Sequence, residues 1–100
     1  MNRHVYRYSF ADSVPVEEIQ ATLLLAVMGT ESLHGQSQVR LDAAHYLDEK
    51  QKACVIDAST DVGRDLSRLF TGYLLREFGE DAFHIERPEN IEFQTVEAGT

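Results

Sequence analysis

The feature that most constrains this fold is a strand, a turn and a helix that follow one another within residues 53–83. An apolar run at 54–58 leads into a short polar turn, and a long pattern with apolar residues three and four positions apart begins after it. This spacing places them on one face of an α-helix. They are Val62, Leu66, Leu69, Phe70, Tyr73, Leu74 and Phe78. Gly79 predicts the end of the helix, because glycine readily adopts the left-handed conformation that closes helices.

This helix cannot be stable alone. Burying five of its large apolar side chains contributes roughly 1.5–3 kcal/mol each, whereas ordering roughly eighteen residues costs about 1–2 kcal/mol per residue. The apolar face must therefore pack against other elements, and the remaining chain contains strand-like segments of suitable length.

Alternating and helical patterns predict these other elements. Residues 3–10 alternate, with aromatic side chains on one face, and predict a first strand. Pro15, followed by Glu17 and Glu18, predicts the start of a helix that ends at Gly35 at the latest. Residues 38–48 alternate again and predict a second strand, joined by a charged hairpin turn to a third at 53–58. Phe83 and Ile85 predict a fourth strand, with a short extension at 91–93.

The order of elements predicts an α+β fold, the ferredoxin-like βαββαβ sandwich. Two right-handed crossovers and one hairpin give a four-stranded antiparallel sheet in the order 4-1-3-2, with both helices on one face. The alternative keeps the same elements but changes the strand order, or exchanges a strand between two chains. We expect one domain at residues 1–94 and a frayed C-terminal tail at 95–100.

The charge and the cysteine content exclude several classes of partner. The formal net charge is −8 and the nine basic residues are scattered, which argues against nucleic acid and anionic membrane surfaces as partners. Cys54 is the only cysteine and lies in an apolar run, as expected for a buried thiol in a cytoplasmic protein. The apolar run at 23–28 is too short to span a bilayer, and the N-terminal region lacks the order of a signal peptide.

Polar residues gather where the third strand meets the second helix, and they are candidates for a ligand site. The fold should bring together Asp57, Ser59, Thr60, Asp61, Arg64, His4 and His34. The competing interpretation is that Thr60 or Asp61 caps the helix, while four charged residues of its first turns form ion pairs three and four positions apart. We favour this capping interpretation, because helices normally begin with such residues.

The charges at this junction decide which ligand it can hold. Its aspartates outweigh Arg64 and the helix dipole, so a divalent cation is favoured over a phosphate. The four histidines lie on four different predicted elements, and at best His4 and His34 share a metal with Asp57. Isolated histidines are more often structural, so we expect no metal and no cofactor.

Two helices cover only one side of a four-stranded sheet, and the other side is rich in apolar residues. We expect the interface of a homodimer there, at Val5, Arg7, Tyr46, Val55 and His84. The alternative is a monomer whose open face is screened by residues 91–96. The sequence thus favours a non-catalytic interaction or binding module that self-associates through the open sheet face. A small enzyme, or a ligand- or divalent-cation-binding protein that uses the junction, is the alternative.

Overall fold

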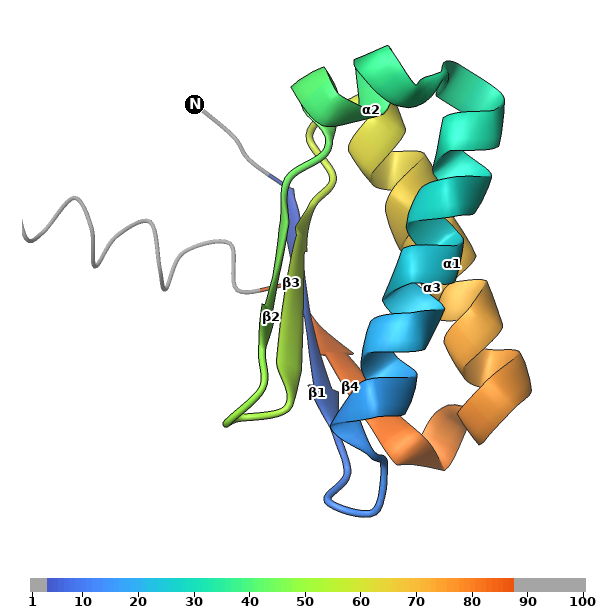
Figure 1. Ribbon diagram of the computed structural model, residues 1–100. Helices are drawn as coiled ribbons and strands as arrows, with labels where there is room; N and C mark the ends of the chain where they lie inside the picture. Colours follow the sequence, from blue (N-terminus) through green and yellow to red (C-terminus); the bar gives the residue numbers. More distant parts are fainter. Residues whose placement is uncertain (1–3, 88–100) are drawn as a thin grey trace, which may run out of the picture.

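Residues 4–87 are described by a computed structural model and form two layers, with a sheet on one side and helices on the other (Figure 1). The elements, in chain order, are β1 (Val5–Phe10), α1 (Val16–His34), α2 (Gln36–Asp42), β2 (His45–Asp48), β3 (Ala53–Asp57), α3 (Asp61–Phe78), the 3-10 turn η1 (Glu80–Ala82) and β4 (Phe83–Glu86). The predicted tail at 95–100 and the strand extension at 91–93 lie outside the described residues.

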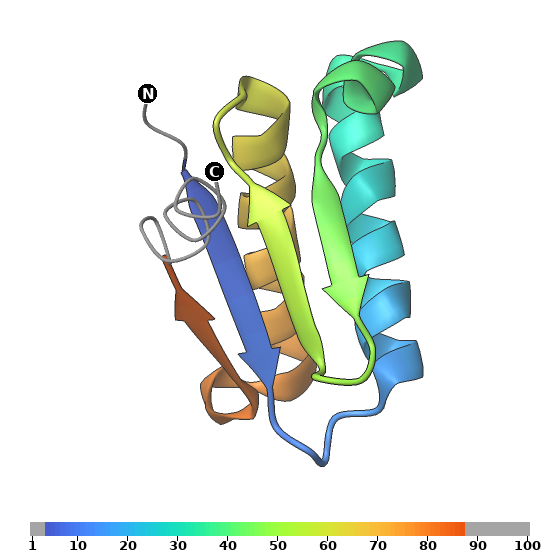
Figure 2. The same cartoon turned by 90° about the vertical axis from the view of Figure 1, so that its left-hand side faces the viewer.

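The four strands form one sheet in the order β2-β3-β1-β4, and every neighbouring pair is antiparallel (Figure 2). Strand β1 is central: Tyr8 pairs with Cys54 of β3 on one side and with Ile85 of β4 on the other. Strands β2 and β4 are the edges. The predicted four-stranded antiparallel sheet is confirmed.

The prediction of one strand over residues 38–48 is wrong in its first half, and residues 4–87 contain three α-helices instead of the two that were expected. Gly35, with φ at 89°, ends α1 and turns the chain into α2. Val39 and Ala43 alternate with polar residues, but they are also four positions apart, as on one face of a helix. In helix α2 the side chain of Val39 is buried, whereas that of Leu41 is 79% exposed. Strand β2 therefore consists of His45–Asp48 only.

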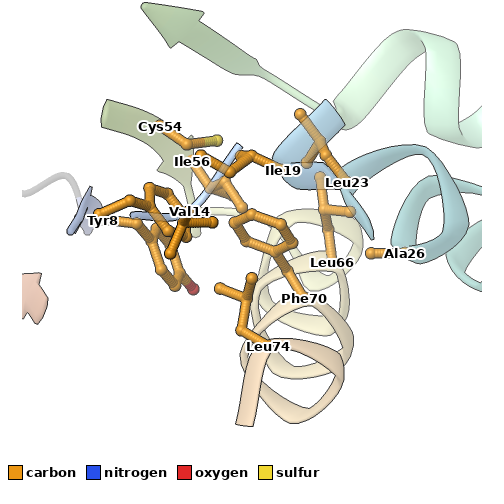
Figure 3. Packing of buried hydrophobic residues seen from close by; sticks show 11 residues of the cluster. Tyr8, Val14, Ile19, Leu23, Ala26, Cys54, Ile56, Leu66, Phe70 and Leu74 are labelled. Atoms are coloured by element: carbon orange, nitrogen blue, oxygen red, sulfur yellow. The ribbon is translucent and has the colours of Figure 1, made fainter. Parts of the chain in front are cut away.

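The core lies between the sheet and the inner faces of α1 and α3 (Figure 3). It contains Tyr8 and Phe10 of β1, Cys54 and Ile56 of β3, Ile19, Leu23 and Ala26 of α1, and Leu66, Phe70 and Leu74 of α3. The rings of Tyr8 and Phe70 meet edge to face, with centroids 4.9 Å apart. The predicted inner face of α3 is confirmed, and so is the helix end at Gly79.

The start of α3 is pressed directly against the end of β3. A Cβ atom added at Gly63 would overlap the carbonyl oxygen of Asp57, so only glycine fits this position without a backbone shift. This close approach fixes where the polar junction between β3 and α3 sits relative to the sheet.

Candidate functional site

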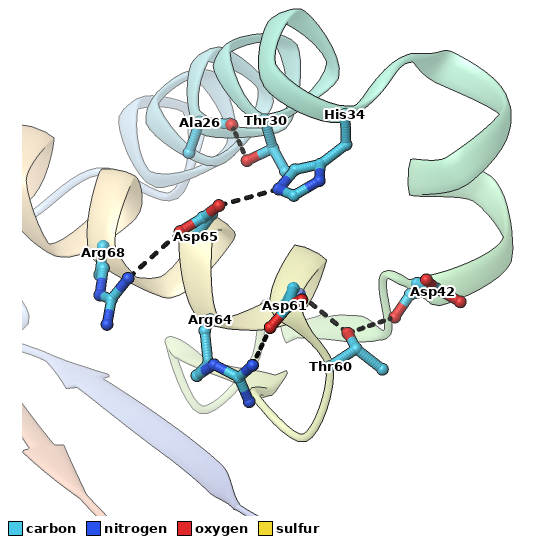
Figure 4. A network of polar contacts seen from close by, with 10 residues as sticks. Ala26, Thr30, His34, Asp42, Thr60, Asp61, Arg64, Asp65 and Arg68 are labelled. Atoms are coloured by element: carbon cyan, nitrogen blue, oxygen red, sulfur yellow. Dashed lines mark hydrogen bonds and ion pairs between the residues drawn. The ribbon is translucent and has the colours of Figure 1, made fainter.

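The predicted site at the β3–α3 junction is a helix cap. Thr60 Oγ1 accepts a hydrogen bond from the Gly63 N–H at 3.0 Å and donates one to the Asp42 carbonyl at 3.2 Å (Figure 4). Asp57 Oδ1 accepts from the Ser59 N–H at 2.9 Å. Thr60 is therefore the N-cap of α3, as the capping interpretation predicts.

The two histidines assigned to this site lie in different places. The backbone of His4 joins the junction, because its N–H donates to Ser59 Oγ at 3.2 Å and its carbonyl accepts from the Ala58 N–H at 2.6 Å. His34 instead places its Nε2 2.8 Å from Asp65 Oδ2. Within residues 4–87, no three His, Cys, Asp or Glu side chains are grouped as a metal site requires. A divalent-cation site at the junction stays a prediction.

The predicted ion pairs on the first turns of α3 are confirmed. Arg64 pairs with Asp61, and Arg68 Nη1 lies 3.3 Å from Asp65 Oδ1. Figure 4 shows Asp65 between His34 and Arg68, with one carboxylate oxygen toward each. Exposed pairs of this kind contribute at most about 1 kcal/mol, so either arginine can exchange its partner at little cost.

A cavity of about 420 Å³ opens between α3 and the strands β1 and β4. We call it the α3–β4 cavity. It is lined by Tyr6 and Tyr8 of β1, Ile85 of β4, and Arg64, Ser67, Arg68, Thr71, Gly72 and Leu75 of α3. The six helix residues recur three and four positions apart, so they form one side of α3. This spacing marks one side of α3 in the sequence, but it does not reveal the cavity, because the gap between α3 and the strands depends on how separate elements pack.

Of the two buried hydroxyl groups beside the cavity, that of Tyr8 is hydrogen-bonded within the described residues and that of Ser67 is not. Tyr8 Oη lies 2.8 Å from Thr71 Oγ1 and donates to the Ser67 carbonyl at 3.3 Å. Burial raises the pKa of Tyr8 above its ordinary value, so this hydroxyl stays protonated at neutral pH. Ser67 is 5% exposed, and within the described part of the chain its Oγ is buried without a hydrogen-bond partner.

The outer side of α1 carries a group of exposed apolar residues that the sequence analysis also missed. Leu24, Leu25 and Met28 are exposed by 59%, 52% and 53%, and we call them the α1 outer face. A shallow hollow of about 400 Å³ adjoins them, lined by Leu25, Met28, Gly29, Glu31, Ser32, Gln36 and Tyr73.

The open sheet face, where we predicted the dimer interface, exposes less apolar surface than expected. Val5 is only 4% exposed, and Val55 is half-buried. Arg7 is also half-buried, and its Nη2 donates to Gln51 Oε1 at 3.0 Å. Tyr46 and His84 are exposed, but they lie on the two edge strands. The exposed members of this predicted interface are thus separated by the width of the sheet.

No helix within residues 4–87 combines the length and the apolar character needed to cross a membrane. A comparison with protein-family models finds no match, and a comparison with curated proteins finds none either.

Proposed function

We propose that this chain is a non-catalytic interaction module that self-associates, with the α1 outer face as the contact between two copies. One observation carries the proposal: α1 is apolar on the side that faces the sheet and again on the side that faces away from it. A surface helix of a monomer normally presents charged and polar residues outward. A group of exposed leucine and methionine side chains marks a surface that another molecule covers.

A second copy of the chain suits this surface. Leu24, Leu25 and the hollow beside Gly29 adjoin one another, so a two-fold pairing centred on Leu25 covers both leucines and the hollow of each copy. Leu25 lies at the midpoint of α1. It also belongs to a series with Ala21, Met28 and Ser32 at spacings of four, three and four, which is the spacing of helix-pairing seams.

The open sheet face remains the competing contact surface. Its central residues are buried or half-buried, whereas the α1 outer face offers adjacent side chains that are each more than half exposed. This contrast is why we place the contact on α1.

We infer a ferredoxin-like topology and a cytoplasmic location as the setting of this function. The order β2-β3-β1-β4, with antiparallel pairs throughout, supports the topology. The free, fully buried thiol of Cys54 supports a reducing compartment.

Analytical ultracentrifugation at micromolar concentration tests self-association. We expect the wild-type chain to sediment at about twice its monomer mass of 11.3 kDa. Leu25→Glu should sediment as a monomer, because each copy would bring a charge into the apolar contact. Leu75→Glu is the matched control: Leu75 is 47% exposed but lies on α3, and this variant should remain a dimer.

Two results would change the proposal. A wild-type chain that sediments at 11.3 kDa contradicts self-association altogether. A dimer that survives Leu25→Glu but dissociates in Tyr46→Glu moves the contact to the open sheet face, because Tyr46 is 65% exposed on that side.

A further inference from the structure

We infer that the α3–β4 cavity binds a small organic carboxylate, with its carboxylate at Arg64, Arg68 and the Ser67 hydroxyl and its apolar body against Tyr6, Leu75 and Ile85. The cavity is lined by α3, β1 and β4, whereas the α1 outer face belongs to another helix. Ligand binding and self-association can therefore be tested separately.

The charge of the cavity wall opposes the charge of the chain. The whole sequence has a formal net charge of −8, yet the nine described residues that line this cavity include two arginines and no acidic residue. A third arginine lies close by, because the Arg87 guanidinium carbon is 5.6 Å from the centre of the Tyr6 ring. One third of the nine basic residues of the sequence thus gathers at one cavity. An anionic group is the ligand chemistry that this arrangement favours.

The Ser67 hydroxyl is an independent sign of a ligand. Three hydroxyls of α1, those of Thr22, Thr30 and Ser32, each donate to the carbonyl four positions earlier, at 2.8, 2.8 and 3.2 Å. Ser67 of α3 is buried but makes no such bond. Buried hydroxyls are normally paired, and Ser67 lines the cavity, so an oxygen acceptor of a ligand that reaches this hydroxyl would supply the bond that residues 4–87 leave unmade.

A carboxylate fits these donors. Arg64 and Arg68 are four positions apart on α3 and therefore project from the same side of the helix. A planar guanidinium group binds a planar carboxylate through two parallel hydrogen bonds, and a serine hydroxyl adds a third donor. The exposed ion pairs of both arginines with aspartates are weak enough to be exchanged for a ligand.

The remaining wall is apolar and leaves room for the body of the ligand. Tyr6, Leu75 and Ile85 supply an aromatic and an aliphatic surface. A Cβ atom added at Gly72 would meet nothing within 4 Å, so the helix leaves space there. The volume of about 420 Å³ lies within the range of about 300–1,000 Å³ that is typical of small-molecule sites.

Five probes test binding: octanoate, indole-3-acetate, octanol, octylamine and inorganic phosphate. They distinguish the contribution of the ligand's charged group from that of its apolar part. Isothermal titration calorimetry should show binding of at least one carboxylate, tenfold or more tighter than octanol and octylamine. Nuclear magnetic resonance should place the shifted amides at Thr71, Gly72 and Ile85. The preferred carboxylate tells whether the body is aliphatic or aromatic. No carboxylate binding at millimolar concentration overturns the inference, and so does phosphate that binds as tightly as the best carboxylate.

Four variants test the assigned contacts. Arg68→Gln should weaken carboxylate binding about tenfold, whereas Arg76→Gln, the same change outside the cavity wall, should have no effect. Ser67→Ala should weaken binding several-fold without lowering the melting temperature, because it removes an unpaired hydroxyl. Gly72→Leu should fill the cavity and abolish binding in a folded chain.

Two patterns among these variants would contradict the assignment. Equal losses in Arg68→Gln and Arg76→Gln would show that only the overall charge of the chain matters. A lower melting temperature in Ser67→Ala with unchanged affinity would give this hydroxyl a purely structural role.

Discussion

Helices α1 and α3 lie side by side on the same face of the sheet (Figure 1), yet their outer sides differ in chemistry. The inner sides are alike, because both bury large aliphatic or aromatic residues in one core. Outward, α3 presents the ion pairs of Arg64 and Arg68. The outer side of α1 presents leucine and methionine. Folding explains both inner sides and the outer side of α3, but it does not require an apolar outer side on α1. That surface is where interaction with another molecule is expected.

Truncating buried side chains on the inner sides of α1 and α3 should cause the largest losses of stability. The losses should be similar for the two helices. Phe70→Ala should lower the free energy of unfolding by about 3–5 kcal/mol and Ile19→Ala by about 2–5 kcal/mol, because both residues are fully buried. Arg68→Ala, on the outer side of α3, should cost less than about 0.5 kcal/mol. Urea denaturation measures all three. If Ile19→Ala lowered the free energy of unfolding only slightly, the inner sides of α1 and α3 would not be alike, because α1 would then not share the core.

Adding one methyl group at different glycines tests how tightly each part of α3 is packed. Gly63→Ala should destabilise by about 1–3 kcal/mol, because its Cβ would overlap the Asp57 carbonyl oxygen. Gly72→Ala, the same change in open space, should stabilise by about 0.5–1 kcal/mol. Chemical denaturation of the pair gives both values. Effects of the same sign would show that the start of α3 is not docked on β3 as described.

The pH dependence of stability tests the burial of Cys54 in the core beneath both helices. Figure 3 shows this residue beside Ile56 and Ile19. Burial raises the pKa of this thiol from 9.0 to about 12. The unfolded chain then loses the thiol proton before the folded chain does. Stability should therefore be independent of this group below pH 9 and should fall by about 1 kcal/mol per pH unit between pH 9 and 12.

The control for this pH effect is Cys54→Ala, which should reduce the alkaline loss of stability. A smaller loss should remain, because burial also raises the pKa of Tyr8. An identical alkaline slope in the variant and in the wild-type chain would show that Cys54 ionises as freely in the folded state as in the unfolded one.

The sequence predicted the parts of the fold that depend on local patterns. Spacing and turn chemistry predict the inner side of α3 and the strands β1 and β3, and all are present. They also predict a side-chain cap of α3 at Thr60 or Asp61, and the structure places it at Thr60. Helix α2 was missed, because Val39 and Ala43 satisfy both a two-residue and a four-residue period. Only the packing of Val39 into the structure decides between the two.

The candidate sites were less predictable, because they depend on distances between elements. The α3–β4 cavity requires β4 to lie beside β1 with α3 above both, and no local pattern gives that spacing. The α1 outer face was hidden because residues 23–28 form a continuous apolar run. A run of this kind does not tell which members face the core, and burial assigns Leu23 and Ala26 to the core but Leu24 and Leu25 to the surface.

Disulfide trapping at the midpoint of α1 tests the central claim most directly. In a Cys54→Ala background, Leu25→Cys should form an intermolecular disulfide under mild oxidation, because a residue at the midpoint of two paired antiparallel helices faces its own copy. Tyr46→Cys and Leu75→Cys should remain mostly uncrosslinked under the same conditions. Rapid crosslinking of Tyr46→Cys alone, or equally slow crosslinking of all three variants, would contradict a contact through the α1 outer face.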